Sequence, residues 1–302
     1  MQFPIEINVI DTSLKSLNSA QVGLQEIKIS KEVKSINYHQ SITNLPKFLD
    51  YVVVATNSDI RLEVVRAVLS HSKVKYMLLE KVLFQRVVDY EQARSLLKLH
   101  NVSTWVNCPR RAYDIYHKVK MYFECDTLLY GQVLGGNWGL GCNGIHFLDI
   151  FSKLNQAELK YVDSSGIDSD VHSSKRYGFM EFTGSLTGVY SNGFRFEITS
   201  LKDSLLPLLV TLRSVDKVCI IDESCGKAFF YKTRCPQLWD CEDFSVPHLS
   251  SLVPELASDI LNNGKSLLPS LAESIQCHIP FIEALIRARA KVIPSDDVCP
   301  IT

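Results

Sequence analysis

Short apolar runs that alternate with helical repeats over the first third of this 302-residue chain constrain its fold more than any other feature. The runs are rich in β-branched residues, and the longer ones are almost entirely apolar, as in strands of a parallel sheet covered on both faces. They are Ile5–Ile10, Ile27–Ile29, Tyr51–Thr56, Tyr76–Glu80 and Val102–Val106. Helices are predicted after Thr12 or Ser13, after Asn57 and Ser58, and over Val88–Leu99. This order predicts right-handed β-α-β units in a doubly wound parallel sheet.

The pattern changes after about residue 119. We predict a strand over Tyr122–Tyr130, a glycine-dense turn from Gly131 to Gly144, a helix over Ile145–Leu154 and an exposed loop over Asp163–Lys175. Six further strands are predicted over 178–183, 185–190, 194–200, 208–213, 217–222 and 228–232, and two helices over 249–262 and 270–290. We therefore expect two domains, an α/β domain over 1–119 and an α+β domain over 120–302 with an open, largely antiparallel sheet.

Composition excludes several classes of protein. The chain has 32 Lys and Arg against 33 Asp and Glu, so we expect no broad basic surface for nucleic acid. The longest apolar run, Leu205–Leu212, is shorter than the roughly 18 residues of a membrane helix, and no signal peptide is visible at Met1–Glu6. Nine cysteines without a CxxC pair predict reduced thiols, and the histidines lack metal-ligand spacing. We expect a cytoplasmic protein with no nucleic-acid, membrane or metal partner.

Polar residues follow several of the predicted strands. They are Asp11, Thr56, Asn57, Glu80, Lys81 and Asn107. Ligands of doubly wound sheets bind outside the carboxyl ends of the strands, so these residues form the candidate ligand site. A structural alternative stays open, because Asp11 can be a helix N-cap and Thr56 with Asn57 can cap the next helix.

Three local motifs occur in a characteristic order. They are Ala55-Thr56-Asn57, Glu80-Lys81, and Gly144-Ile145-His146-Phe147-Leu148-Asp149. A fourth stretch, from Asn263-Gly264 to Glu283-Ala284, follows these three motifs along the chain. Over about residues 5 to 290 the chain resembles the glucose-fructose oxidoreductase, inositol dehydrogenase and MocA (Gfo/Idh/MocA) family.

The resemblance implies a Rossmann-like domain that binds NAD or NADP and transfers a hydride to or from a sugar, polyol or nucleotide-sugar group. It implies that His146 is the general base and that Lys81 stabilises alkoxide charge on the same oxygen. The cofactor would be bound by Asp11, Thr56, Asn57, Glu80, Lys81 and Asn107. Asn143 and Asp149 would hold sugar hydroxyls, and Arg110 and Arg111 would bind substrate anions. Asp11 favours NAD, because a carboxylate repels a 2′-phosphate.

Each site residue also has a plain structural interpretation. His146 can be a buried, satisfied histidine at a helix start, and Lys81 can be an exposed lysine at a strand end. Arg110 and Arg111 can face solvent at a helix start. Trp138 is more simply a packing residue than a stacking platform.

Three departures from the family pattern bear on these expectations. Only ten residues precede Asp11, so we expect an N-terminally incomplete sheet that lacks the first strand, the Gly-x-Gly-x-x-Gly loop and the first helix. In the strand order 3-2-1-4-5-6, Ile5–Ile10 and Tyr51–Ala55 would then lose the strand between them. Val82 stands where the family has Pro, and Cys142 where many members carry Asp.

Two classes of function therefore remain, with a third behind them. The first is an NAD(P)-dependent dehydrogenase or reductase acting on CH–OH groups, which associates with copies of itself through the sheet of the second domain. The second is a catalytically impaired or non-catalytic member that binds sugar or serves as a subunit of a complex. A different nucleotide-using Rossmann enzyme, such as a methyltransferase, is disfavoured by the antiparallel second half.

Overall fold

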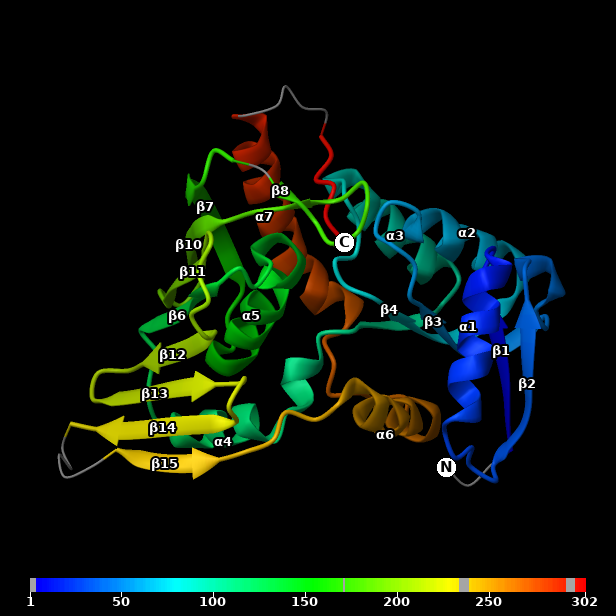
Figure 1. Cartoon of the computed structure of the whole chain (residues 1–302), viewed down its shortest axis with the longest axis horizontal. Helices are drawn as coiled ribbons and strands as arrows, with labels where there is room; N and C mark the ends of the chain where they lie inside the picture. The colour runs from blue at the N-terminus through cyan, green and yellow to red at the C-terminus, as the bar shows by residue number, and fades with distance from the viewer. Residues whose placement is uncertain (1–3, 171, 234–238, 292–296) are drawn as a thin grey trace.

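The computed structural model describes residues 4–170, 172–233, 239–291 and 297–302. Its first part consists of parallel strands joined by helices, drawn in blue and cyan in Figure 1. The elements are β1 (Ile5–Ile10), α1 (Leu14–Gln25), β2 (Val33–His39), η1 (Ile42–Asn44), β3 (Phe48–Val54), α2 (Arg61–His71), β4 (Lys73–Leu79), α3 (Val87–Leu99) and β5 (Ser103–Val106). The predicted alternation of strands and helices is thus confirmed over this part.

The parallel strands form two sheets. In the described residues β1 pairs only with β2, whereas β3, β4 and β5 form a separate sheet in that order. A doubly wound sheet without its central strand has this arrangement, because that strand would pair with β1 on one side and β3 on the other. The backbone groups on the facing edges of β1 and β3 therefore have no strand partner in the described chain.

The second part is built on an eight-stranded sheet with the order β15-β14-β13-β12-β6-β11-β10-β7. One pair, β6 with β11, is parallel, and the other pairs are antiparallel, as predicted. A small hairpin, β8 with β9, stands apart. The strands are β6 (Tyr130–Gly136), β7 (Leu159–Ile167), β8 (His172–Ser173), β9 (Met180–Glu181), β10 (Gly184–Tyr190), β11 (Arg195–Leu201), β12 (Leu209–Arg213), β13 (Lys217–Asp222), β14 (Lys227–Lys232) and β15 (Asp240–Asp243).

Helices link the two parts of the molecule. They are η2 (Pro109–Ala112), α4 (Asp114–Tyr122), α5 (Leu140–Asn155), α6 (Leu249–Asn263) and α7 (Leu271–Ala290). Helices α5 and α7 pack against each other and against the larger sheet, as Figure 1 shows. Ser270 begins α7 with a capping box to Glu273, and it also pairs with Trp105 of β5. The carboxyl end of β5 and the start of α7 are thereby joined.

One hydrophobic core runs through most of the chain. It extends from Val54 to Ile301 and includes residues of β3–β5, α2–α7 and the larger sheet. No residue of β1, α1 or β2 belongs to it. Helix α1 buries only Leu17, while Leu14 and Val22 are 57% and 59% exposed. None of the helices in the described residues is both long and apolar enough to cross a membrane.

Four predicted elements were wrong. Ile27–Ile29 is not a strand, because β1 takes its parallel partner from the longer segment Val33–His39. The strand expected at Tyr122–Tyr130 starts only at Tyr130, since α4 ends at Tyr122 and a turn follows. The turn expected over Gly131 to Gly144 is wrong as well, because residues 131–136 belong to β6 and α5 begins at Leu140. Its glycines have a packing role: a Cβ at Gly131 would lie 2.6 Å from the ring of Phe194, so glycine is needed there.

The last correction concerns Asp163–Lys175, which we expected to be an exposed loop. Its first part continues β7, which pairs with β10 at the edge of the larger sheet. An edge strand carries polar residues toward solvent, which is why the Ser- and Asp-rich sequence resembled a loop. Residue 171 of this stretch lies outside the described residues.

Candidate functional site

The carboxyl ends of β3, β4 and β5 meet at one edge of their sheet. Asn107, after β5, donates from Nδ2 to Glu80 Oε1, after β4, over 2.5 Å. Buried Arg61 of α2 donates from its guanidinium to the carbonyl oxygens of Thr56, Val82 and Leu83. Burial lowers the pKa of Arg61 to about 10, so the side chain remains charged at neutral pH. Sequence reasoning missed Arg61, which ties the loop after β3 to the loop after β4.

Lys81 connects this edge to the second part of the molecule. Its Nζ donates to the carbonyl oxygen of Cys142, in the first turn of α5, over 3.1 Å. Burial lowers the pKa of Lys81, while the neighbouring Cys142 and Glu80 act in the opposite direction. Lys81 Nζ therefore lies beside the turn of α5 that precedes His146, and its positive charge helps to lower the pKa of His146.

His146 lies inside this junction. It is buried, and its Nδ1 has no hydrogen-bond partner. Burial, with the nearby positive charges of Arg110 and Lys81, holds the pKa of His146 well below its usual value. The imidazole is therefore neutral at pH 7, which is the form that can accept a proton. The interpretation of His146 as a satisfied core histidine does not fit, because one ring nitrogen is unpaired.

Several buried polar atoms around Lys81 and His146 lack partners. In the described residues they include Thr56 Oγ1, Arg61 Nε, Asn107 Oδ1, His146 Nδ1 and His278 Nε2. His278 of α7 contributes to the lowering of the pKa of His146. The positive charges of Arg61 and Lys81 contribute in turn to the lowering of the pKa of His278. Buried polar groups normally have partners. A group of unpaired atoms at strand ends is therefore the expected signature of a place for water or a polar ligand.

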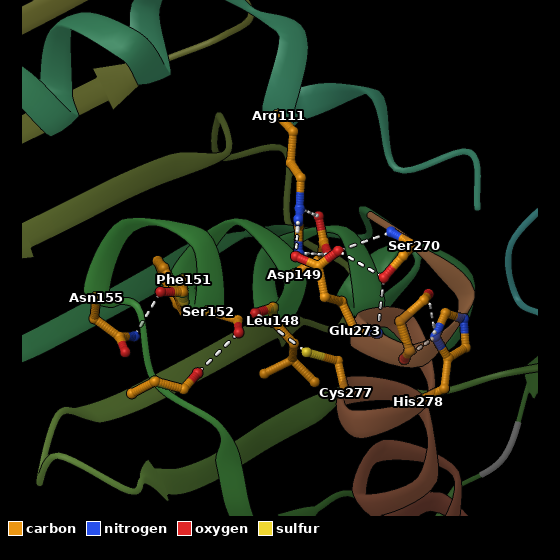
Figure 2. Close-up of polar contacts among 12 residues, drawn as sticks. Arg111, Leu148, Asp149, Phe151, Ser152, Asn155, Ser270, Glu273, Cys277 and His278 are labelled. Atoms are coloured by element: carbon orange, nitrogen blue, oxygen red, sulfur yellow. Dashed lines mark hydrogen bonds and ion pairs between the residues drawn. The ribbon is translucent and has the colours of Figure 1, made fainter. Parts of the chain in front are cut away.

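Arg111 and Asp149 are paired with each other. The guanidinium of Arg111 makes two bonds of 2.8 Å to Asp149 and a third of 2.8 Å to Glu273 (Figure 2). Burial raises the pKa of Asp149 to about 6, and Arg111 acts against that rise, so the carboxylate is ionised at pH 7. Burial also acts to raise the pKa of Glu273, but bonds from Arg111 and Ser270 lower it to about 2. The network joins η2, α5 and α7.

Arg110 is held in a similar way. It makes two bonds, of 2.9 and 2.7 Å, to Glu223, which also accepts from the Tyr116 hydroxyl. Its guanidinium lies over the ring of Phe147, 4.3 Å from the centroid. The interpretation of Arg110 and Arg111 as solvent-facing arginines is therefore wrong, because both are engaged by carboxylates of the same chain.

The remaining predicted residues also have partners. Asn143 donates from Nδ2 to the carbonyl of Trp138 over 2.8 Å, and Asn57 Oδ1 accepts from Arg176 over 2.8 Å. Asp11 lies at the end of β1, in the other parallel sheet, and accepts from the backbone N–H of Ser13 over 2.7 Å. Ser13 is the N-cap of α1, so the interpretation of Asp11 as that cap is wrong. The interpretation of Thr56 and Asn57 as caps is wrong too, because α2 begins at Arg61, after Ile60.

Glu181 of β9 is a further residue that sequence reasoning missed. Its carboxylate accepts from the backbone N–H groups of Gly141 and Cys142 at the start of α5. A negative charge is favourable at the N-terminus of a helix. In the described residues no group of His, Cys, Asp and Glu is placed to hold a metal ion. Eight of the nine cysteines are described and are free thiols, and Cys235 lies outside the described residues.

No protein-family model and no curated protein sequence matches this chain. Solved structures do resemble it. UDP-N-acetylglucosamine 3-dehydrogenase GnnA from Acidithiobacillus ferrooxidans is 11% identical, with a TM-score of 0.71 over 97% of this chain and 100% of that one. An oxidoreductase from Agrobacterium radiobacter, solved with NAD+, L-tartaric acid and magnesium, is 14% identical, with a TM-score of 0.72 over 94% and 88%.

The similar structures include a regulator as well as oxidoreductases. The transcriptional regulator Gal80p from Kluyveromyces lactis is 16% identical, with a TM-score of 0.69 over 96% of this chain and 85% of that one. At such identities the likeness shows the fold alone. The chain shares with these structures a mixed α/β fold that has parallel Rossmann-like sheets and a larger mixed sheet.

Proposed function

We propose that this chain is an NAD(P)-dependent oxidoreductase that interconverts a hydroxyl and a carbonyl group on a sugar, polyol or nucleotide sugar. The observation that carries the proposal is the meeting of Lys81 and His146. The bond from Lys81 Nζ to the Cys142 carbonyl places the lysine on the turn of α5 that precedes His146. Unpaired buried polar atoms of Thr56 and Asn107 lie just after β3 and β5, at the strand edge where ligands of this architecture bind.

The residues present fit a nicotinamide cofactor, because Thr56 Oγ1 and Asn107 Oδ1 are buried acceptors with no partner in the chain. Thr56, Asn57, Glu80, Lys81 and Asn107 would hold it, and Asp11 at the end of β1 favours NAD over NADP. When bound, the cofactor supplies the hydride acceptor or donor. The chain's own share is to orient the substrate and to move its proton.

In the oxidation direction, neutral His146 accepts the proton of the substrate hydroxyl as the carbon–hydrogen bond breaks. Lys81 donates a hydrogen bond to the same oxygen and stabilises the negative charge that develops on it. The carbon–oxygen single bond becomes a double bond, and the hydride leaves with its electron pair. In the reduction direction His146 returns the proton. Asn143 is the polar side chain on the first turn of α5 that would contact a substrate hydroxyl.

The charged residues that the resemblance implied would bind the substrate have a different role in this proposal. Arg110, Arg111 and Asp149 are positioning residues, because their charges are matched within the chain. They hold η2 and α5 together beneath the reacting groups, and a substrate would reach them only by breaking an ion pair. The protein is proposed to act in the cytoplasm on small molecules, and the larger sheet is its proposed surface for self-association.

The test combines cofactor binding with turnover. NADH or NADPH should raise the melting temperature, with about 2.7 kcal/mol of stabilisation at a hundredfold excess over Kd. With NAD+ and a panel of UDP-N-acetylglucosamine, other nucleotide sugars and free polyols, His146→Gln should lower turnover about 10²–10⁴-fold while the Kd for NADH stays unchanged. His100→Gln is the matched control, because it makes the same substitution at an exposed histidine. It should leave both turnover and the Kd for NADH unchanged. Undiminished turnover in His146→Gln contradicts the proposal.

A non-catalytic role is the second candidate. Two observations favour it: the separation of β1–β2 from β3–β5, which splits the cofactor half of the fold, and the likeness to a transcriptional regulator. Such a protein would show a melting shift with a nucleotide sugar and none with NADH or NADPH. A shift with either dinucleotide rejects this candidate.

A further inference from the structure

The segment 299–302, called here the tail segment, is largely buried. Cys299 and Ile301 are completely buried and belong to the hydrophobic core, and Thr302 is 6% exposed. In Figure 1 the C mark lies between the larger sheet and the parallel strands. The tail segment therefore occupies the junction between the two parts of the molecule.

Hydrogen bonds attach the tail segment to the loop that follows β3 and to the loop that follows β4. After β3, the backbone N–H of Ser58 donates to Thr302 Oγ1 over 3.0 Å, and the Ser58 hydroxyl donates to the carbonyl of Ile301. After β4, the carbonyl of Gln85 accepts from the N–H of Cys299 over 2.9 Å. The tail segment is thus bonded to the loops that follow the carboxyl ends of β3 and β4.

On its other side the tail segment meets β9 and α5. The N–H of Met180 donates to the carbonyl of Pro300 over 2.7 Å. A Cβ on Gly141 would lie 3.2 Å from Ile301, so the tail segment rests on the first turn of α5. The backbone of Thr302 also hydrogen-bonds the Cys142 thiol. Cys142 is the residue whose carbonyl accepts from Lys81, so the tail segment adjoins the catalytic lysine.

We propose that the tail segment is a built-in competitor for the dinucleotide: it occupies the strand ends that the cofactor needs, and cofactor binding displaces it. The inference rests on the proposed function. Ligands of doubly wound sheets bind outside the carboxyl ends of the strands, and here the tail segment contacts the loops that follow two of those ends. The apparent Kd is then the intrinsic Kd divided by the fraction of molecules with the tail displaced.

A purely structural strap predicts the opposite behaviour. If the tail segment only fastened the two parts together, loosening it would disorder the strand ends and weaken dinucleotide binding. If it competes, loosening it strengthens binding. The sign of the change in Kd therefore separates the two roles.

The experiment compares the unsubstituted chain with the double variant Ser58→Ala, Thr302→Val. These substitutions remove two hydrogen bonds that hold the tail segment and keep the apolar contacts of Ile301. We expect NADH to bind the variant about tenfold more tightly, as the loss of two hydrogen bonds of ordinary strength implies. Ser70→Ala, an exposed serine of α2, is the matched control and should leave the Kd unchanged.

Amide hydrogen exchange of the unsubstituted chain gives a second readout. Saturating NADH should speed exchange at the N–H groups of Cys299 and Met180, because their bonds to and from the tail segment break. Equal or weaker binding by the variant, or slower exchange at these amides with NADH, overturns the competition and leaves the proposed function intact. If neither chain binds NADH or NADPH while the variant's Cys299 amide exchanges faster, the proposed function fails and the competition fails with it.

Discussion

Two regions of this molecule have the same local design and different packing. The N-terminal unit, β1–α1–β2 over residues 5–39, and the part of the main body over residues 48–106 both consist of parallel strands joined by helices. Helix α3 of the main body buries Tyr90, Ala93 and Leu97, whereas α1 buries only Leu17. No residue of the N-terminal unit belongs to the hydrophobic core, which includes residues of all three main-body parallel strands.

The difference teaches that a β-α-β pattern is enough to form the unit but not enough to bury it. In the described residues β1 has one strand neighbour and β3 has one, so both present an unpaired edge. Phe48 and Val53 of β3 and Ile7 of β1 also have exposed side chains. Apolar surface left in water forgoes roughly 25 cal/mol per Å² of stabilisation. We expect the N-terminal unit to be the least stable region of the fold.

The largest effect is expected from Arg111→Ala, which breaks the network at the centre of the main body. Arg111 is buried, and its loss leaves the Asp149 carboxylate buried without a cation. Such a loss costs about 3–5 kcal/mol in the free energy of unfolding. Urea unfolding followed by circular dichroism measures it. Arg94→Ala, in an exposed pair with Glu91, should cost less than about 1 kcal/mol. Equal losses in the two variants would contradict this account of the core.

The second prediction compares the two regions directly. Met77→Ala in β4 removes a completely buried side chain of the shared core and should cost about 2–5 kcal/mol. Leu17→Ala in α1 removes the one buried side chain of a helix outside that core. It should leave the main unfolding transition almost unchanged and speed proteolytic cleavage within residues 5–39. A loss as large as that of Met77→Ala would mean that both regions unfold together.

The smallest effect is a pH dependence confined to the main body. Burial lowers the pKa of His278 to about 3, so the folded state holds this ring neutral while the unfolded state protonates it below about pH 6.5. The stability from His278 is therefore present above pH 6.5 and is lost as the pH falls, by about 1.4 kcal/mol per pH unit.

His278→Gln, which cannot titrate, isolates this contribution. The difference in unfolding free energy between the two chains should change by that slope between pH 6 and pH 4. His100→Gln, an exposed site, should keep the slope of the unsubstituted chain. A constant difference between the unsubstituted chain and His278→Gln would show that the buried ring is not neutral in the folded state.

Much of the candidate site could be predicted from the sequence because it depends on local signals. Glu80 and Lys81 end a continuous apolar run, and His146 lies on a helix that follows a glycine-dense turn. The partners of these residues could not be predicted. Asp149 and Arg111 are individually plausible substrate ligands, and only their approach to within 2.8 Å shows that they neutralise each other. His278 lacked any spacing signal, since its neighbours come from α2, α5 and the end of β4.

By itself, the sequence determined which segments are strands and helices wherever apolar periodicity was long. The tertiary structure alone decided that the arginines are paired with carboxylates and that Cys299 to Thr302 contact the loops after β3 and β4. The physical reason is that periodicity records which face of a segment is buried. It does not record what buries that face, because the partner comes from a distant part of the chain.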